Sequence, residues 1–463
     1  MLMPAVSCPH QDADTTRRVC FHLLETKDAD YYWQFTGVGM EYDLVCLACR
    51  EHADQLEANL REVCLECFEE IREEGCWDGI IGRPQIRERP TNLSFSHQVI
   101  ALSEPISDRI LDIQPIEALA RSVWVALTET GALLWIDLAD CAARALAQLP
   151  ASEVQLKEPV SLHLSMDGHL AAVVNAYGQH GIVLHLHTGL ATMPLKRDTY
   201  YIGISEFPIA FCELEGRTLL IHGTKWNRLD ISDPRTGALL TRRVFPPYER
   251  GKSIPEHYLD YFHCSLSISP SQEWIADNGW IWSPVGSVES WSLRRWLQEN
   301  TWESEDGPSK KTLCRRDYYW NGPLCWIDGQ TLAVWGYGKD EEWLIPAVRV
   351  FDVPSGNELR WFPGPLDEPH QTEKAPYQEA QAGYLRAGQA GYLRAGPRGF
   401  LAFDTYLFAC SEARGTSVWD IAAGERLLHD AALCPVRYHR GARQFLSVLP
   451  DGAFQISQLI GQP

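Results

Sequence analysis

The chain has 463 residues and a formal net charge of −20, from 41 basic and 61 acidic side chains. A surface of this sign repels a phosphate backbone, so nucleic acid is a poor expected partner. Hydrophobic residues make up 45 % of the chain, which is enough for a substantial core. The sequence has no run of about 18 apolar residues, so we expect no membrane span. The first residues lack the basic segment and the apolar segment of a signal peptide, so we expect none.

The cysteines indicate a reducing compartment. Seven of the 14 lie before residue 80, and the other seven are scattered singly along apolar stretches. Single cysteines in apolar surroundings are typical of buried free thiols rather than of disulfides. We therefore expect a cytoplasmic protein.

Two cysteine pairs near the start of the chain carry the sharpest chemical signal. Cys46-x2-Cys49 and Cys64-x2-Cys67 are separated by 14 residues. Four thiolates delivered as two close pairs can surround one tetrahedral Zn²⁺ completely and leave no open position for water or substrate. The spacing therefore predicts one structural zinc ion held by these four cysteines. Redox use of a single CxxC pair is the weaker alternative.

Other residues near the pairs could also bind a metal, although buried or disordered positions are the favoured interpretation for most of them. His52 could replace one of the four cysteines. The further potential ligands are Cys20 with His22, Cys76, and Cys8 with His10.

Residues 1–90 are expected to form a small α+β zinc-binding module. Residues 19–24 and 31–35 alternate well enough to predict two strands, and residues 64–75 predict a helix that ends at Gly75. A cysteine knuckle followed by a helix that begins with the second pair resembles the treble-clef family of zinc fingers. Residues 41–90 contain 13 acidic side chains against six arginines and no lysine, which suits a protein partner better than a nucleic acid.

From residue 91 to residue 463 the pattern changes to short apolar strands separated by tight turns. Turns such as Asp167-Gly168 and Asp451-Gly452 lie between two expected strands, which is typical of hairpins. A later strand of each unit ends in a three-residue pattern: an aromatic or apolar residue, then Asp, then an apolar residue. Trp419-Asp420-Ile421 is an example. Units of this kind resemble the WD40-like blades of β-propellers. Within residues 91–463, only Trp419-Asp420 is a literal WD pair.

The resemblance implies a mainly β protein with seven blades, with six or eight as alternatives. Units begin near residues 108, 160, 207, 262, 322 and 398, and a partial unit begins near 434. The strand at 96–102 precedes the first unit, and we expect it to pair with the strand near Ile456 and so close the ring without a bare sheet edge. Polar insertions are expected near 244–260, 298–318 and 363–398. The last of these contains an exact tandem copy, Gln381–Gly388 and Gln389–Gly396, which predicts an exposed loop.

Tryptophan is concentrated in one part of the chain, because 11 of the 17 lie between Trp274 and Trp361. Filling of the space between blades is the favoured interpretation, and an aromatic binding surface is the alternative. The residues expected to be exposed, and so to bind a protein partner, are Trp280, Trp282, Trp296 and Trp302.

The sequence contains no nucleophile elbow, phosphate-binding glycine loop or His-Glu-x-x-His motif. We therefore expect a non-catalytic scaffold or adaptor that binds protein partners. The first alternative is a propeller enzyme whose catalytic residues gather in the central channel from several blades. The second is a nucleic-acid-binding protein, which the net charge disfavours.

Overall fold

The computed structural model describes residues 16–36, 42–82, 84–244, 253–282, 285–317, 319–337, 345–365 and 399–461. The chain divides into two compact units. The first runs to Glu88 and takes in Phe362–Gly364, and the second contains the remainder. None of the helices in these ranges combines the length and the apolar character that a membrane crossing needs.

The first unit is a five-stranded sheet with short helices. Its strands lie in the order β4-β1-β3-β2-β5; β1 is parallel to β3 and β2 to β5, whereas the β1–β4 and β2–β3 pairs are antiparallel. The elements are β1 (Thr16–Cys20), α1 (Phe21–Glu25), β2 (Asp30–Phe35), β3 (Tyr42–Cys46), α2 (Leu47–Glu51), η1 (Ala53–Gln55), α3 (Leu56–Asn59), β4 (Leu60–Cys64), α4 (Leu65–Glu74) and β5 (Cys76–Ile81).

The helix expected at residues 64–75 is confirmed as α4, which ends before Gly75. A Cβ atom at Gly75 would lie 2.6 Å from the Ala29 carbonyl oxygen, so only glycine allows this approach of the backbone. The strand expected at 19–24 is wrong from Phe21 onward, because Phe21–Glu25 is the helix α1. Leu23 is fully buried from this helical turn, and alternation over six residues does not distinguish one turn of helix from a strand.

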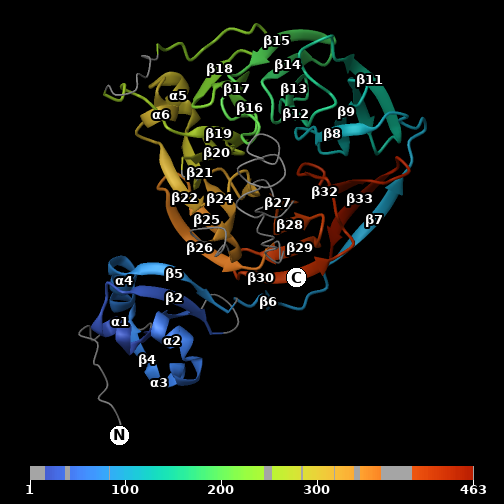
Figure 1. Ribbon diagram of the computed structural model, residues 1–463. Helices are drawn as coiled ribbons and strands as arrows, with labels where there is room; N and C mark the ends of the chain where they lie inside the picture. Colours follow the sequence, from blue (N-terminus) through green and yellow to red (C-terminus); the bar gives the residue numbers. More distant parts are fainter. Residues whose placement is uncertain are drawn as a thin grey trace. The chain divides into compact units, whose positions relative to one another are not determined.

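The second unit is a ring of seven antiparallel sheets (Figure 1). The first three sheets are β8 (Ile110–Pro115), β9 (Val123–Thr128), β10 (Ala132–Asp137) and β11 (Ala142–Gln148); β12 (Val160–Leu164), β13 (Leu170–Asn175), β14 (His180–His185) and β15 (Leu190–Lys196); and β16 (Ile209–Leu214), β17 (Arg217–Lys225) and β18 (Arg228–Ser232).

The next three sheets follow in chain order around the ring. They are β19 (Phe262–Ile268), β20 (Trp274–Ile281), β21 (Val285–Ser292) and β22 (Lys311–Asp317); β23 (Leu324–Trp326), β24 (Thr331–Tyr337), β25 (Ile345–Asp352) and β26 (Asn357–Pro363); and β27 (Gly399–Phe403), β28 (Leu407–Ser411), β29 (Gly415–Asp420) and β30 (Glu425–Asp430). The short strand β6 (Arg87–Glu88) precedes the ring in sequence.

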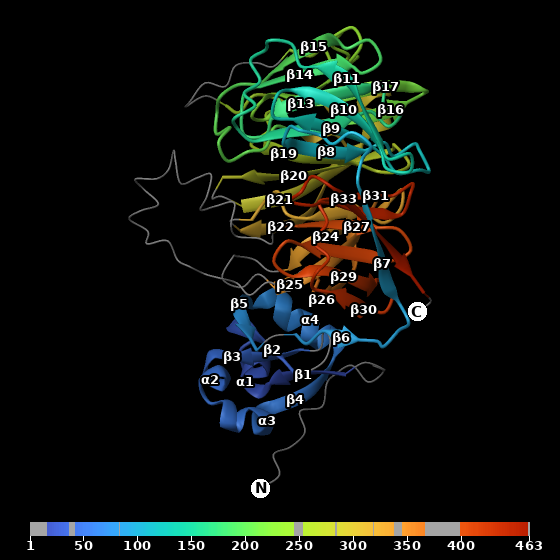
Figure 2. The ribbon, with the colours of Figure 1, turned by 90° about the vertical axis from the view of Figure 1, so that its right-hand side faces the viewer.

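The seventh sheet joins the two ends of the propeller. It contains β31 (Arg437–His439), β32 (Gln444–Val448), β33 (Phe454–Ile460) and the early strand β7 (Ser94–Ile100). Val99 pairs with Gln455 and Gln98 pairs with Ile456, and β7 runs beside β33 (Figures 1 and 2). The predictions of seven blades and of ring closure by the strand near Val99 are therefore confirmed.

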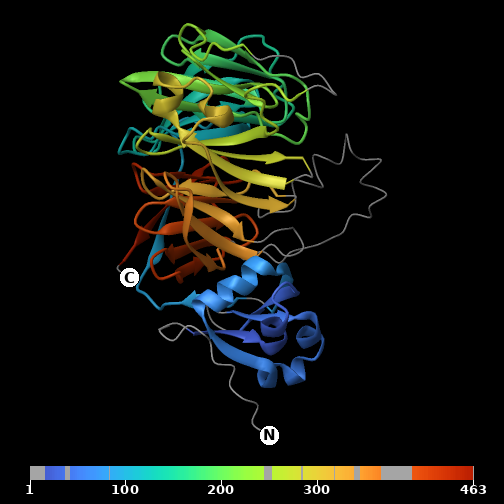
Figure 3. The ribbon, with the colours of Figure 1, turned by 90° about the vertical axis from the view of Figure 1, so that its left-hand side faces the viewer.

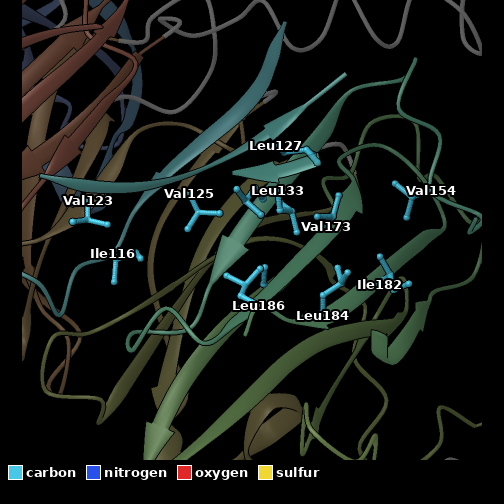
Figure 4. Close-up of a cluster of buried hydrophobic side chains, with 12 residues drawn as sticks. Ile116, Val123, Val125, Leu127, Leu133, Val154, Val173, Ile182, Leu184 and Leu186 are labelled. Atoms are coloured by element: carbon cyan, nitrogen blue, oxygen red, sulfur yellow. The ribbon is translucent and has the colours of Figure 1, made fainter. Parts of the chain in front are cut away.

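The core of the propeller lies between neighbouring blades. Every residue of β9 and of β13 is buried, because both faces of these middle strands are covered by adjacent sheets. Val125, Leu133, Val173 and Leu184 belong to the cluster that fills the space between the first two blades (Figure 4). Both strands are apolar except for their last residues, Thr128 and Asn175, as burial on two faces requires.

The recurrent aspartates at the ends of the third strands organise turns. Asp137, Asp352 and Asp420 each accept a hydrogen bond from a backbone N–H two or three residues later. The third blade differs, because Asp230 within β18 is buried and paired with Arg243. Asp233 organises the turn there by accepting from the Arg235 and Thr236 N–H groups.

The expected insertions are only partly described. Segment 298–318 is an insertion only in its first part, since Lys311–Asp317 is the fourth strand of its blade. The helices α5 (Leu293–Gln298) and α6 (Glu303–Asp306) lie at the outer rim of the ring (Figures 1 and 3). Residues 245–252 and 366–398, which include the duplicated octapeptide, lie outside the described residues.

Candidate metal centre and exposed aromatic patch

The first unit brings three cysteines and one histidine together at one end of its sheet. β1 and β3 are neighbouring parallel strands, each ends in a cysteine, and each continues directly into a helix. Parallel strands end at the same edge of a sheet, so Cys20 and Cys46 lie side by side there. Helix α1 then supplies His22 and helix α2 supplies Cys49.

The four side chains form a compact donor set. The three sulfur atoms and one ring nitrogen of Cys20, His22, Cys46 and Cys49 all lie within 4.8 Å of one another. The His22 Nδ1 atom is 3.3 Å from Cys49 Sγ and 3.6 Å from Cys46 Sγ. Cys20 Sγ accepts a hydrogen bond from the Cys46 N–H at 3.3 Å, and Asn59 Nδ2 donates to Cys49 Sγ at 3.5 Å.

Electrostatics disfavour three closely spaced thiolates without a cation. Burial raises the pKa of the Cys20 thiol to about 12, and the neighbouring Cys46 and Cys49 sulfurs contribute in the same direction. Burial also raises the pKa of Cys49, again with help from Cys46. A divalent cation at the centre would reverse this, because it stabilises the deprotonated sulfur directly.

The donor set fits a metal ion. Three thiolates and one imidazole are the Cys₃His combination of closed tetrahedral sites. Zn–S distances of about 2.3 Å in such a site put the sulfur atoms a little under 4 Å apart, which this cluster can reach. Cys20, His22, Cys46 and Cys49 could therefore hold a metal ion.

The register of the sheet does not bring Cys46 and Cys49 together with Cys64 and Cys67, so the expectation that these four share one ion is corrected. β4 runs antiparallel to β1, so Cys64 pairs with Thr16 and Leu60 pairs with Cys20. Cys64 is thus four residues along the strand from the level of Cys20, which corresponds to about 13 Å. The first and second CxxC pairs lie at opposite ends of the sheet, and the resemblance to a treble clef does not extend to a shared ion.

Two ligands that the spacing argument set aside are central to the cluster. Cys20 and His22 form a Cys-x-His pair, and the strand was expected to continue through both of them. The change from strand to helix at Phe21 brings His22 over the cysteines. Among the described residues His52 and Cys76 are outside the cluster, and Cys8 and His10 lie outside the described part of the chain.

The four tryptophans expected at the surface differ in their exposure to solvent. Trp280 and Trp296 are fully buried, so the expectation that they are exposed is wrong. Trp280 stacks on Phe262 with ring centroids 3.8 Å apart, and Trp296 contacts Trp291 between the third and fourth blades. Trp302 is half-buried and stacks on His257. Only Trp282, which is 41 % exposed, projects substantially into solvent.

Trp282 belongs to an aromatic patch that the sequence did not reveal. Its ring lies 4.9 Å from the ring of Tyr201, which in turn contacts Tyr200 at 4.8 Å. Tyr200 is 45 % exposed and Tyr201 is 37 % exposed. The buried stack of Phe262 and Trp280 supports these rings from below. We call Tyr200, Tyr201 and Trp282 the aromatic patch; the Tyr-Tyr pair ahead of the third unit was its only sequence signal.

Titratable groups also meet on the innermost strands. Asp112 on β8 accepts a hydrogen bond from Arg437 on β31 at 2.6 Å and from the Leu162 N–H on β12. His163, next to Leu162, lies 3.1 Å from the Ser161 hydroxyl. Burial lowers the pKa of His163 to about 4; Asp112 opposes this shift and Arg437 reinforces it. This inner cluster connects the first, second and last blades.

Fold and site together define a seven-bladed β-propeller preceded by a small module with a cysteine–histidine cluster. No family model matches the chain, and no curated protein matches it. Among solved structures, the chain is similar to the β-propeller domain of Cps50 (Swd1) from Myceliophteria thermophila, with 10 % identity and a TM-score of 0.46. The similarity covers 79 % of this chain and all of that domain.

Proposed function

We propose that this protein is a non-catalytic scaffold or adaptor whose propeller binds a protein partner through the aromatic patch. The observation that carries the proposal is the exposure of Tyr200, Tyr201 and Trp282 above a buried aromatic stack. Tyrosine and tryptophan dominate the binding energy of protein interfaces, since they bury a large area at a small cost in conformational entropy. A net charge of −20 favours a partner that is not a polyanion.

The rigid support of the patch is consistent with this role. Trp280 donates a hydrogen bond from Nε1 to Ser205 Oγ, and Trp320 donates to the Ile204 carbonyl oxygen. These bonds tie the segment that carries Tyr200 and Tyr201 to the fourth blade and to the segment that precedes the fifth. An anchor held in one position before binding loses little freedom in the complex.

For the first unit we propose a structural zinc ion bound by Cys20, His22, Cys46 and Cys49. A closed Cys₃His site has no open position, so the ion would stabilise the sheet rather than act on a substrate. Buried single thiols elsewhere, such as Cys212, Cys264 and Cys410, support our proposal that the protein works in the reducing cytoplasm.

The alternative of a propeller enzyme would have to use the inner cluster. Asp112 already accepts from Arg437, from the Leu162 and Ile113 N–H groups and from Gln114, so its carboxylate is committed to structural bonds. The low pKa of His163 means that this imidazole would be a weak base at neutral pH. These features favour a structural role for the cluster and support the scaffold proposal.

Affinity capture from the native host tests the proposed function. The intact protein should retain a specific partner, and the double variant Tyr201→Ala/Trp282→Ala should lose at least tenfold in capture, since each aromatic anchor contributes more than about 1 kcal/mol. Leu359→Ala is a matched control, because Leu359 is 58 % exposed on another blade. Equal capture by the double variant and the control would contradict the proposal.

A further inference from the structure

A cavity of about 500 Å³ opens beside the second blade, and the proposed function does not use it. One wall is the connection from β11 to β12, and the other is the turn between β13 and β14 with the residues that flank it. The described lining is mostly polar and includes the carboxylates of Glu153 and Glu158 but no lysine or arginine. Both glutamates are exposed. The cavity therefore offers two accessible carboxylates to a polar ligand.

Hydrogen bonds hold the two walls of this cavity together. Asn175, which is 6 % exposed, accepts a hydrogen bond on Oδ1 from the Gln155 N–H at 2.9 Å and donates from Nδ2 to the Gln155 carbonyl oxygen at 2.8 Å. The Glu153 Oε2 atom of one wall lies 3.0 Å from the His180 Nε2 atom of the other. A site whose walls are fixed before binding loses little conformational entropy when a ligand enters.

The polypeptide between β15 and β16 connects the cavity to the aromatic patch. Arg197, which is 3 % exposed, donates hydrogen bonds to the Gly178 carbonyl oxygen in the cavity wall and to the Ser205 carbonyl oxygen, both at 2.8 Å. The Ser205 hydroxyl in turn accepts the hydrogen bond from Trp280, whose ring contacts two rings of the patch. The cavity wall and the support of the patch are thus parts of one hydrogen-bonded structure.

The strand order places the cavity and the patch at the same end of the blades. In an antiparallel sheet, the turn after the second strand and the connection after the fourth strand leave from the same end. The cavity lies at the connection after β11 and the turn after β13, and the patch lies on the connection after β15 and at Trp282, just after β20. A partner that covers the patch can therefore extend to the cavity.

We infer that the cavity binds a lysine or arginine side chain of the protein partner, an inference that depends on the proposed binding of that partner to the aromatic patch. Ammonium and guanidinium groups form strong hydrogen bonds with carboxylates, and Glu153 and Glu158 supply these acceptors. The net charge of −20 also attracts a basic segment over a longer range. The partner would then contact the patch with apolar groups and the cavity with a cation.

Saturation-transfer difference NMR of the full-length chain tests the cavity with small probes. At least one of Nα-acetyl-lysine N-methylamide and Nα-acetyl-arginine N-methylamide should give a strong signal. The norleucine analogue, which lacks the cation, should give a much weaker one. Glu153→Gln/Glu158→Gln should lose the signal of the basic probe. Absence of that signal in the unsubstituted protein, or equal signals from the basic and norleucine probes, would overturn the inference.

The matched control for the cavity variant is Glu104→Gln/Glu412→Gln. It removes the same net charge at two exposed glutamates outside the cavity lining, so it should keep the signal of the basic probe. Equal loss of signal in the control and in the cavity variant would show that the probe responds to net charge rather than to the cavity, and would also overturn the inference.

Partner capture separates this inference from the proposed function. Glu153→Gln/Glu158→Gln should lower capture about fivefold at low ionic strength and less at high ionic strength, because salt screens the attraction. The patch variant Tyr201→Ala/Trp282→Ala should keep the probe signal, so its loss of capture reports on the patch alone. Unchanged capture by the cavity variant would overturn occupation of the cavity by the partner, whereas unchanged capture by the patch variant would contradict the proposed function.

Discussion

A single histidine on an inner strand makes the stability of the propeller depend on pH. His163 titrates at about pH 4 in the folded chain, because burial disfavours its charged form. An unfolded histidine titrates at about pH 6.5. Between these values the unfolded chain binds one more proton than the folded chain, so this contribution to stability is complete above about pH 6.5 and is lost as the pH falls towards about 4.

We predict that His163→Asn flattens this pH dependence. Asparagine does not titrate, so the difference in unfolding free energy between wild type and variant should shrink by up to about 3 kcal/mol from pH 7 to pH 4. The variant should be the less stable protein at neutral pH, because it disturbs the contact with Ser161. Denaturant unfolding monitored by tryptophan fluorescence measures both quantities. Parallel pH profiles for the two proteins would contradict the assignment.

At the scale of the single element, two turn glycines allow the cost of backbone strain to be measured apart from the cost of a steric clash. Gly415 and Gly216 both have left-handed backbone angles, with φ of +79° and +73°. A Cβ atom at Gly415 would lie 2.1 Å from the Asp430 carbonyl oxygen, whereas one at Gly216 would meet no atom within 4 Å. The two glycines therefore form a matched pair.

We predict that Gly415→Ala destabilises the propeller much more than Gly216→Ala does. The second substitution should cost about 1 kcal/mol, from the left-handed conformation alone. The first should cost roughly 2–4 kcal/mol, because the backbone around Asp430 must also shift. Thermal unfolding of the two variants compares these costs. Equal melting temperatures would show that the turn at Gly415 can relax.

The closing sheet gives a second prediction for an element. Removal of residues 454–463, which include all of β33, would expose the edges of β32 and β7 and take the fully buried Phe454 from the core. Bare sheet edges promote association between chains. The shortened protein should therefore be aggregated or insoluble. A monomeric peak in size-exclusion chromatography, with an unchanged melting temperature, would contradict the pairing.

The sequence predicted the elements of the propeller better than the ligands of the metal cluster. The blade starts expected near 160 and 262 coincide with β12 at Val160 and β19 at Phe262, since alternation and turn residues are local properties of the chain. The cysteine grouping failed because it depends on strand direction. Spacing along the chain cannot show that β4 runs antiparallel to β1 and carries Cys64 to the opposite end. Burial of Trp280 was likewise decided by the stacking of Phe262 from a neighbouring strand.

At the scale of the whole molecule, the two units should lose structure under different conditions. The first unit has a small core around one five-stranded sheet, whereas the second has cores between successive blades. Small domains often depend on a bound metal for folding free energy. We expect the folding free energy of the propeller not to depend on a bound metal.

We predict that strong chelation unfolds residues 16–82 and leaves the propeller folded. Calorimetry of the full chain should show the loss of one transition on metal removal and its recovery when Zn²⁺ is added back. The main transition should move by no more than a degree or two. Loss of both transitions together would mean that the propeller also depends on the metal. An unchanged scan in metal-free protein would mean that the first unit is stable without any ion.

The most direct test of the scaffold proposal is hydrogen–deuterium exchange of the full chain with and without its captured partner. We predict slower exchange in the partner complex around residues 198–204 and 278–282, which carry the aromatic patch, and little change in the inner strands near His163. Protection confined to those inner strands, with no effect at Tyr200, Tyr201 or Trp282, would contradict the scaffold proposal.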